Sequence, residues 1–324
     1  MSHEFESGFT VVQPPWHGLG TVLEDPPETA SQAICAAGLN WIVTKECLES
    51  VVPVDGTYRA VGLHDHYAIV RRKIEHGITR LDALGVVGKQ YHPLQNHAAF
   101  SFFDRVVQSG LVKYSTAGSL RGGRVIWVLA RLNGTLRIAG DDVVDKYLLL
   151  TNSHDGSRPV TIMFTPIRVV CANTLAMALH SSDRRLSVRH TPSAAARIRD
   201  VGEYLAGCNA SFDDSAEAYR FLAQHCIHAA ELARYLRGLF PDPEEGALRN
   251  RARANREKIT ARFERGFGTD ITCASWWRAY NAVVEFIDHD RNSGNADARV
   301  HSAWLGQGMQ LKQQALSAAL QLAA

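Results

Sequence analysis

The stretch 117–181 constrains the fold most, because it contains three short apolar runs separated by turn-forming residues. The runs Arg124–Leu132, Lys146–Thr151 and Val160–Thr165 are rich in Val, Ile, Leu and aromatic residues, a composition typical of strands. The dipeptide 155–156 is Asp-Gly and lies between the second and third runs, which favours a hairpin at that point. The pattern therefore predicts three consecutive antiparallel strands.

The residues after Pro166 change from strand-like to helical spacing. Apolar residues recur on one helix face at Ile167, Val170, Cys171, Leu175 and Ala178. Together with the three strands, this spacing predicts an α+β fold class: an antiparallel sheet with a β-β-β-α core.

The C-terminal part of the chain is dominated by helical patterns. Helices are expected over residues 193–205, 215–236, 244–263, 273–288 and 296–322. We therefore expect an α+β sheet domain over residues 1–185 and an all-helical region over 186–324, packed on or beside it. The apolar positions of the last two helices share a heptad-like spacing, which predicts that these helices pair within the chain.

The N-terminal part alternates strand-like and turn-like segments. Helices are expected at 28–37 and 97–109, and strands at 41–54, 58–61, 67–74 and 84–87. The triplet His64-Asp65-His66 is interpreted as a polar turn, because three consecutive residues of a strand cannot all face one metal ion.

The composition is that of an ordinary globular protein, with 46% hydrophobic and 21% charged residues. No apolar run approaches ~18 residues, so a membrane span is not expected. The N-terminus has neither the basic start nor the apolar segment of a secretory signal. The six cysteines form no CxxC pair, which favours reduced thiols over disulfides or zinc, and we assign no cofactor or metal site.

The net charge of +2 conceals an uneven distribution. Residues 113–199 carry a net charge of +8, and the rest of the chain carries −6. A basic segment inside a nearly neutral protein indicates an anionic partner met on one face, although scattered, solvated arginines would give the same count.

The candidate nucleic-acid contacts are cations at strand ends and turns, with one aromatic ring. Gly122 and Gly123 would let a phosphate approach closely. Arg168, in the first turn of the expected helix, opposes the helix dipole, and a bound phosphate would relieve that conflict. Tyr114 is a candidate for base stacking, whereas mid-strand Trp127 is assigned to the core. The candidate residues are Tyr114, Arg121, Arg124, Arg131, Arg137, Lys146, Arg158 and Arg168.

A second basic run extends from Arg249 to Arg265. It carries seven Lys and Arg residues against Glu257 and Glu264. Such a run is usually the solvated side of an amphipathic helix, so it ranks as a secondary candidate.

An enzyme is the alternative from another functional class. Asn152, His154, Asp155 and Ser157 cluster in one loop, and His with carboxylates can hold a divalent ion for phosphoryl chemistry. The same residues are also what a tight turn is made of. A metal-dependent nuclease or phosphodiesterase therefore remains the second hypothesis, and whether the chain is an enzyme is left open.

Long motifs of the chain resemble a known family. They are PPWHGLG (14–20), GVVGKQYHPLQN (85–96), AGSLRGGRVIWVLARL (117–132), LLLTNSHDGSRPV (148–160), FTPIRVVCANTL (164–175) and SAWLGQGMQLKQQAL (302–316). Together they resemble the phage/plasmid-like protein family, a domain-of-unknown-function family of mobile genetic elements. The resemblance implies a mobile element in a bacterial cytoplasm and supplies no catalytic residue.

The expected β-β-β-α order is also similar to the core of single-strand annealing proteins, a likeness of topology alone. The leading hypothesis is a cytoplasmic, homo-oligomeric protein that binds or anneals single-stranded DNA in recombination or replication. A protein-interaction factor that blocks host defence is a third hypothesis.

Overall fold

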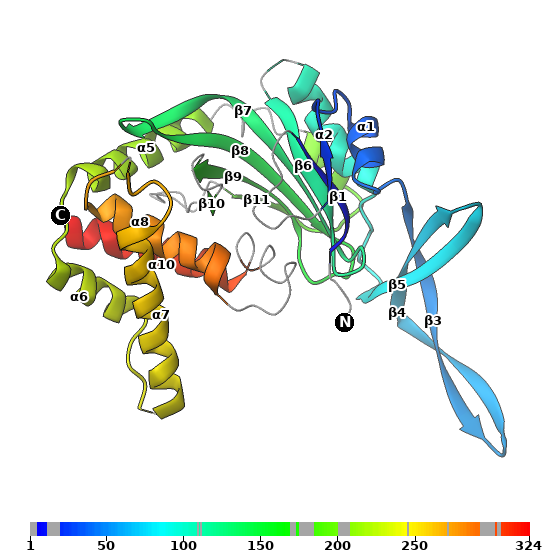
Figure 1. Cartoon of the computed structure of the whole chain (residues 1–324). Coiled ribbons are helices and arrows are strands. Elements are labelled where there is room, and N and C mark those ends of the chain that lie inside the picture. The colour runs from blue at the N-terminus through cyan, green and yellow to red at the C-terminus, as the bar shows by residue number, and fades with distance from the viewer. Residues whose placement is uncertain are drawn as a thin grey trace.

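The computed structural model describes residues 5–11, 20–108, 110, 112–168, 173–174, 185–199, 208–244, 246–270, 272–291, 302 and 306–324. It is a mixed α/β structure in which a large, mainly antiparallel sheet lies between a smaller three-stranded sheet and a group of C-terminal helices (Figure 1). None of the described helices combines the length and the apolar character needed to cross a membrane.

The large sheet confirms the three strands expected from the apolar runs. They are β7 (Val125–Ala139), β8 (Asp142–Ser153) and β9 (Val160–Arg168), joined as antiparallel hairpins. The sheet order is β10-β9-β8-β7-β6-β1-β2, with β11 also paired to β9. The remaining strands are β1 (Phe5–Val11), β2 (Thr21–Leu23), β6 (Val112–Leu120), β10 (Asn173–Thr174) and β11 (Arg185–Val188).

The helix expected after Pro166 is not found where the structure describes the chain. Ile167 and Arg168 still belong to β9, where Arg168 lies opposite both Val144 and Asn173 of β10. The rest of the expected helix lies outside the described residues. The helix predicted from the apolar spacing after Pro166 is therefore wrong at Ile167 and Arg168, because backbone pairing with β8 and β10 continues past the proline.

The second sheet projects from the large one as an arm, and "arm" here means its three strands (Figure 1). They are β3 (Ile42–Val54), β4 (Thr57–Glu75) and β5 (Ile78–Gly88), in the order β3-β4-β5. Residues 58–61 and 67–74 are parts of the single strand β4. The triplet 64–66 therefore lies within β4 and not in a turn, which corrects the expectation. It lies at the irregularity where the β3–β4 register passes from Cys47–Tyr67 to Glu49–Gly62, and of the three only His66 is paired, with Gly88 of β5.

Two helices cover one face of the large sheet. They are α1 (Ala30–Ala36) and α2 (Asn96–Gln108), as the sequence predicts. Thr29 caps α1, accepting from the backbone N–H of Gln32, while the Gln32 side chain accepts from the backbone N–H of Thr29. The main hydrophobic core lies on this face, and a smaller cluster around Trp127 lies on the other, so the assignment of Trp127 to the core is confirmed.

The C-terminal region is helical. Its helices are α3 (Ala194–Arg199), α5 (Cys208–Gln224), α6 (Ala229–Leu239), α7 (Gly246–Arg265), α8 (Trp276–Glu285) with a π-helical extension at Phe286–Asp290, and α10 (Gln307–Ala323). The expected helix 215–236 is two helices, α5 and α6, separated where Cys226 forms a β-bridge with Ser275. The expected packing of the last helix against α8 is confirmed, although Lys312 occupies its buried face.

The helical region packs directly on the large sheet. Phe212 of α5 meets Phe164 of β9 with ring centroids 5.6 Å apart. Trp277 of α8 donates from Nε1 to Oδ2 of Asp142 over 2.7 Å. In contrast to these helices, α7 extends away from the sheet (Figure 1).

Candidate nucleic-acid interface

The predicted cations of the sheet do not form one surface. Arg131 of β7 donates from Nη2 to Oδ1 of Asp145 over 2.8 Å, so its charge is paired. Lys146 of β8 lies over the ring of Phe212, 5.7 Å from its centroid, inside the contact with α5. Arg137 donates to the carbonyl of Gly140 in the turn between the two strands. These three residues therefore each have a local contact, and Arg131 and Arg137 are at the same time more than half exposed.

Tyr114 is the clearest correction among the candidate contacts. Its side chain is only 1% exposed, so no base can stack on it. The hydroxyl donates to Oδ1 of Asp104 over 3.4 Å, and burial together with this carboxylate raises the pKa of Tyr114. Val112 and Tyr114 point to the same covered face while Lys113 points outward, an alternation already visible in the sequence.

Arg121, Arg124 and Arg158 lie in turns at one end of the large sheet. Arg121 and Arg124 flank the β6–β7 turn and are exposed, and Arg158 lies in the β8–β9 turn. Arg168 closes β9, and its side chain lies outside the described residues. Of the eight predicted residues, these turn arginines are therefore the ones that the fold brings to the same end of the sheet.

The glycines between Arg121 and Arg124 do allow a close approach, but not to a ligand. Gly122 and Gly123 have φ angles of 64° and 84°, in the left-handed region. A Cβ at Gly123 would lie 2.6 Å from Nη1 of Arg71, whereas a Cβ at Gly122 would meet nothing within 4 Å. Gly123 therefore makes room for an arginine of the arm.

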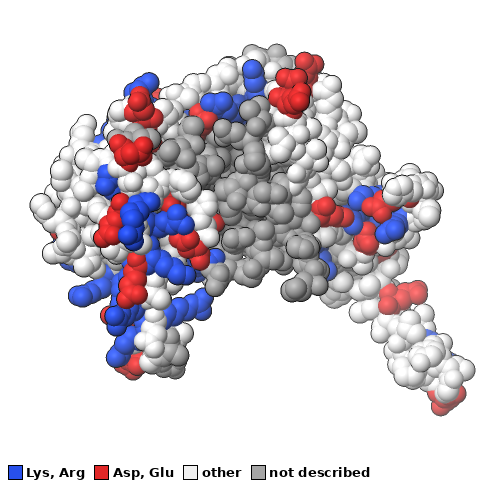
Figure 2. Space-filling model, in the orientation of Figure 1, with Lys and Arg blue, Asp and Glu red and all other residues white. Residues whose placement is uncertain are grey.

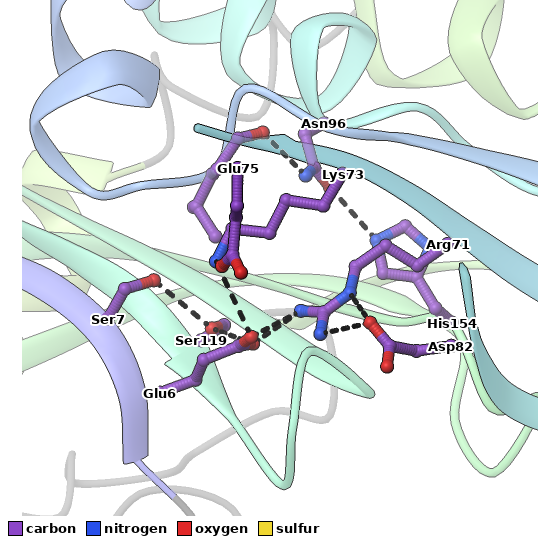
Figure 3. Close-up of polar contacts among 10 residues, drawn as sticks. Glu6, Ser7, Arg71, Lys73, Glu75, Asp82, Asn96, Ser119 and His154 are labelled. Carbon is purple, nitrogen blue, oxygen red and sulfur yellow. Dashed lines mark hydrogen bonds and ion pairs between the residues drawn. The ribbon is translucent and has the colours of Figure 1, made fainter. Parts of the chain in front are cut away.

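That arginine belongs to an ion network that joins the arm to the large sheet (Figure 3). Nη1 of Arg71 lies 2.5 Å from Oε2 of Glu6 in β1, and Nη2 lies 2.7 Å from Oδ2 of Asp82 in β5. Ser119 of β6 donates to the same Glu6 carboxylate over 3.2 Å. Burial would lower the pKa of Arg71, but Glu6 and Asp82 raise it. The network keeps a nearly buried charge paired, as a low-dielectric site requires.

His154, a residue of the nuclease hypothesis, lies just behind this network. It is fully buried against the Trp41 ring, at a centroid distance of 5.2 Å. Its Nε2 lies 2.9 Å from Oδ1 of Asn96, and its backbone N–H donates to the carbonyl of Arg124 over 2.7 Å. Burial, and then the neighbouring His190, lowers the pKa of His154 to about 3. The imidazole is therefore neutral and inaccessible to solvent.

Asp155 is engaged in its own turn. It accepts from the hydroxyl of Ser153 and, over 2.9 Å, from the backbone N–H of Ser157. Burial would raise the pKa of Asp155, but these hydrogen bonds and the nearby Arg121 lower it. Within the described parts of the chain, no three His, Cys, Asp or Glu side chains gather to hold a metal ion. The 152–157 loop thus has the contacts of a structural turn.

Three of the long sequence motifs meet around this turn. The 85–96 segment supplies Asn96 and Tyr91, whose hydroxyl donates to the carbonyl of Ser153 over 2.9 Å. The 117–132 segment supplies the Arg124 carbonyl, and the 148–160 segment supplies His154. The three motifs therefore form the junction between the arm and the large sheet, where their residues hydrogen-bond with one another.

The secondary candidate, α7, carries seven Lys and Arg residues, and Figure 2 shows blue side chains gathered along it. Arg256 pairs with Asp242 over 2.5 Å, and Arg262 pairs with Glu285 and Asp290. Arg251, Lys258 and Arg265 form no ion pair with any residue that the structure describes. Arg251 and Lys258 are exposed, as is Arg265 at the end of the helix. The signal for this surface was in the sequence, as seven cations within one run.

The fold and these surfaces define a mixed α/β protein with two antiparallel sheets, a projecting arm and a projecting basic helix. Residues 83–304 match the model of the family described as Domain of unknown function (DUF932). The chain belongs to this family. No curated protein and no solved structure matches it significantly.

Proposed function

We propose that this protein binds nucleic acid through its phosphate backbone and that α7 makes the principal contact. The observation that carries the proposal is the charge of this helix: seven Lys and Arg residues against Glu257 and Glu264. Its N-terminal half, residues 246–256, contains four arginines and no acidic residue. A cationic helix that projects into solvent is the electrostatic footprint expected of a nucleic-acid contact.

The position of the charges on α7 adds to the argument. Arg249 and Arg251 lie near the N-terminus, where the helix dipole is positive and disfavours cations. The first turn itself contains no acidic residue, although Asp242 and Glu244 precede it in the chain and Asp242 pairs with Arg256. A bound phosphate would add to the stabilisation of these cations at the positive end of the helix.

Single-stranded DNA of a mobile element, bound or annealed during recombination or replication in a bacterial cytoplasm, remains the specific form of the proposal. It is supported by the resemblance of the long motifs to phage and plasmid proteins. The exposed Arg121 and Arg124 provide a second, smaller cationic surface for the same strand. The described residues offer no specific observation that favours the nuclease alternative.

The test is the salt dependence of binding to a fluorescent single-stranded oligonucleotide, followed by anisotropy. The variant Arg251→Ala/Lys258→Ala/Arg265→Ala should lower the log–log salt slope by about 2, because each lost phosphate contact removes ~0.7 on single strands. The charge-matched control is Arg59→Ala/Arg189→Ala/Arg197→Ala, which removes three exposed cations from other elements. Equal slopes for the two folded variants would contradict the role of α7. A double-stranded competitor in the same assay decides the strand preference.

A further inference from the structure

The outer face of the arm is apolar although it faces solvent. The inner face buries Val43, Ile69 and Leu84 against the core. On the outer face the large apolar side chains Ile42, Ile74, Leu81 and Val86 are each more than half exposed. An antiparallel sheet with one face on a core normally presents polar residues on the other. This departure indicates that the outer face is covered by a partner.

The strand register shows that these side chains form one surface. Ile42 lies opposite Arg72, and Arg72 lies opposite Leu81. Val86 lies opposite Ala68, two positions along β4 from Val70. Residues paired across strands share a face of the sheet, so the apolar side chains lie in adjacent rows rather than on scattered sites.

The charges within this surface are balanced. In the part of the outer face formed by residues 42–46, 66–74 and 79–88, two residues are charged, Arg72 and Glu46, and these pair with each other at 3.5 Å. Each side chain is about half exposed, at 51% and 45%. This part of the face therefore carries no net charge, and apolar side chains flank Arg72 on both sides, which suits a protein partner and disfavours a phosphate backbone.

We propose that the outer face of the arm, centred on Ile74 and Leu81, is the contact with a second copy of this chain. A two-fold interface places one surface against itself, so it must carry no charge that repels its own copy. Here Arg72 of one copy can face Glu46 of the other, and the reverse contact forms at the same time. The two arms then pack as stacked sheets about 10 Å apart.

This proposal is independent of nucleic-acid binding, because the arm and α7 share no residue. The test is sedimentation velocity of the full chain from nanomolar to micromolar concentration. Wild type is expected to self-associate, and Ile74→Glu/Leu81→Glu should raise the dissociation constant at least roughly tenfold, since charge would be buried at the centre of the contact. The control Leu248→Glu/Phe267→Glu changes two half-exposed apolar residues of the helical region and should leave association unchanged.

A charge exchange tests the two-fold register. Glu46→Arg and Arg72→Glu should each weaken self-association, and the double exchange Glu46→Arg/Arg72→Glu should restore it. Circular dichroism confirms that every variant is folded. A chain that is monomeric at micromolar concentration overturns the proposal, as does an Ile74→Glu/Leu81→Glu variant that associates like wild type. Failure of the exchange to restore association overturns the two-fold arrangement. If the dissociated variant still binds the oligonucleotide, then self-association through the arm and nucleic-acid binding through α7 are independent of each other.

Discussion

His154 is held by a hydrogen bond from its Nε2 to Oδ1 of Asn96, a distance of 2.9 Å between residues 58 positions apart. The direction of the bond follows from the amide, because Nδ2 of Asn96 already donates to the carbonyl of Leu39 over 2.9 Å. Oδ1 is therefore the acceptor and Nε2 carries the hydrogen. The imidazole is neutral, and its Nδ1 has no hydrogen-bond partner among the residues that the structure describes.

The first prediction is a loss of stability in mild acid. The pKa of His154 is about 3 in the folded chain and near the ordinary value of 6.5 when unfolded. Below pH 6.5 the unfolded chain therefore binds a proton that the folded chain cannot, and the stability falls as pH drops from 6.5 toward 3. At pH 5 the loss due to this group is about 2 kcal/mol.

The measurement is urea unfolding at pH 7.5 and pH 5.0 for wild type and His154→Gln. Glutamine can still donate to Asn96 but does not titrate. The stability that His154→Gln loses between pH 7.5 and pH 5.0 should therefore be smaller than the wild-type loss by about 2 kcal/mol. The pKa of His190 is lowered mainly by burial, and this histidine contributes in the same direction in both proteins. Identical pH dependence in both proteins would show that His154 is accessible to protons in the folded chain.

The second prediction concerns the anchor of the arm. Arg71→Met removes the cation of Asp82 and leaves Glu6 with Lys73 alone, at 3.8 Å, and it should lower the free energy of unfolding by about 2–3 kcal/mol, moderated by the partial exposure of the carboxylates. Arg80→Met removes an exposed pair with Glu75 from the same arm and should lower the free energy of unfolding much less than Arg71→Met does. Chemical denaturation of both variants checks the difference. Comparable losses would show that the network does not hold the arm.

The third prediction uses two adjacent glycines. Gly122→Ala and Gly123→Ala both place a residue with a side chain in the left-handed region of backbone conformation. Each substitution should therefore lower the free energy of unfolding by about 1 kcal/mol. Gly123→Ala also displaces Arg71 from its carboxylates, so it should lower the free energy of unfolding by roughly 1–3 kcal/mol more than Gly122→Ala does. In an Arg71→Met background the two substitutions should cost nearly the same. A persistent difference there would assign the effect to the backbone rather than to Arg71.

The fourth prediction concerns Arg121 and Arg124. Replacing both with Ala should lower the salt slope of single-strand binding by up to about 1.4, if both contact phosphate as the sequence predicts. The effect should be smaller than that of the α7 triple variant. Anisotropy under the same conditions gives the comparison. An unchanged slope in a folded variant would restrict the interface to α7.

Strands with a local pattern could be predicted, and contacts between distant segments could not. The runs around β7, β8 and β9 are bounded by turn residues, so their hairpins follow from short-range rules. The triplet 64–66 has the local composition of a turn, and it is part of a strand because the segments of β4 on either side of it pair with other strands of the arm. Continuation of β9 past Pro166 likewise depends on pairing with β8, which no local spacing records.

The candidate site shows the same division. The charge of α7 is a property of consecutive residues, so the sequence carried it. The burial of His154 depends on Trp41 and Asn96, which are remote in the chain, and its loop has a composition shared by reactive and structural turns. Arg71 gave no sequence signal at all, since its partners Glu6 and Asp82 are chosen by the placement of the arm.

The pairing of β1 with β6 has a consequence for how the chain folds. Glu6 and Ser119, which are hydrogen-bonded across these strands, are 113 positions apart. During synthesis, the hairpins of β3 to β5 involve near neighbours and can form early, whereas β1 must wait until β6 has been made. Until β1 has paired with it, that edge of β6 is open to pairing with other chains. β1 thus enters the sheet long after its own synthesis, and crowding of nascent chains is the condition under which this fold is most exposed to aggregation.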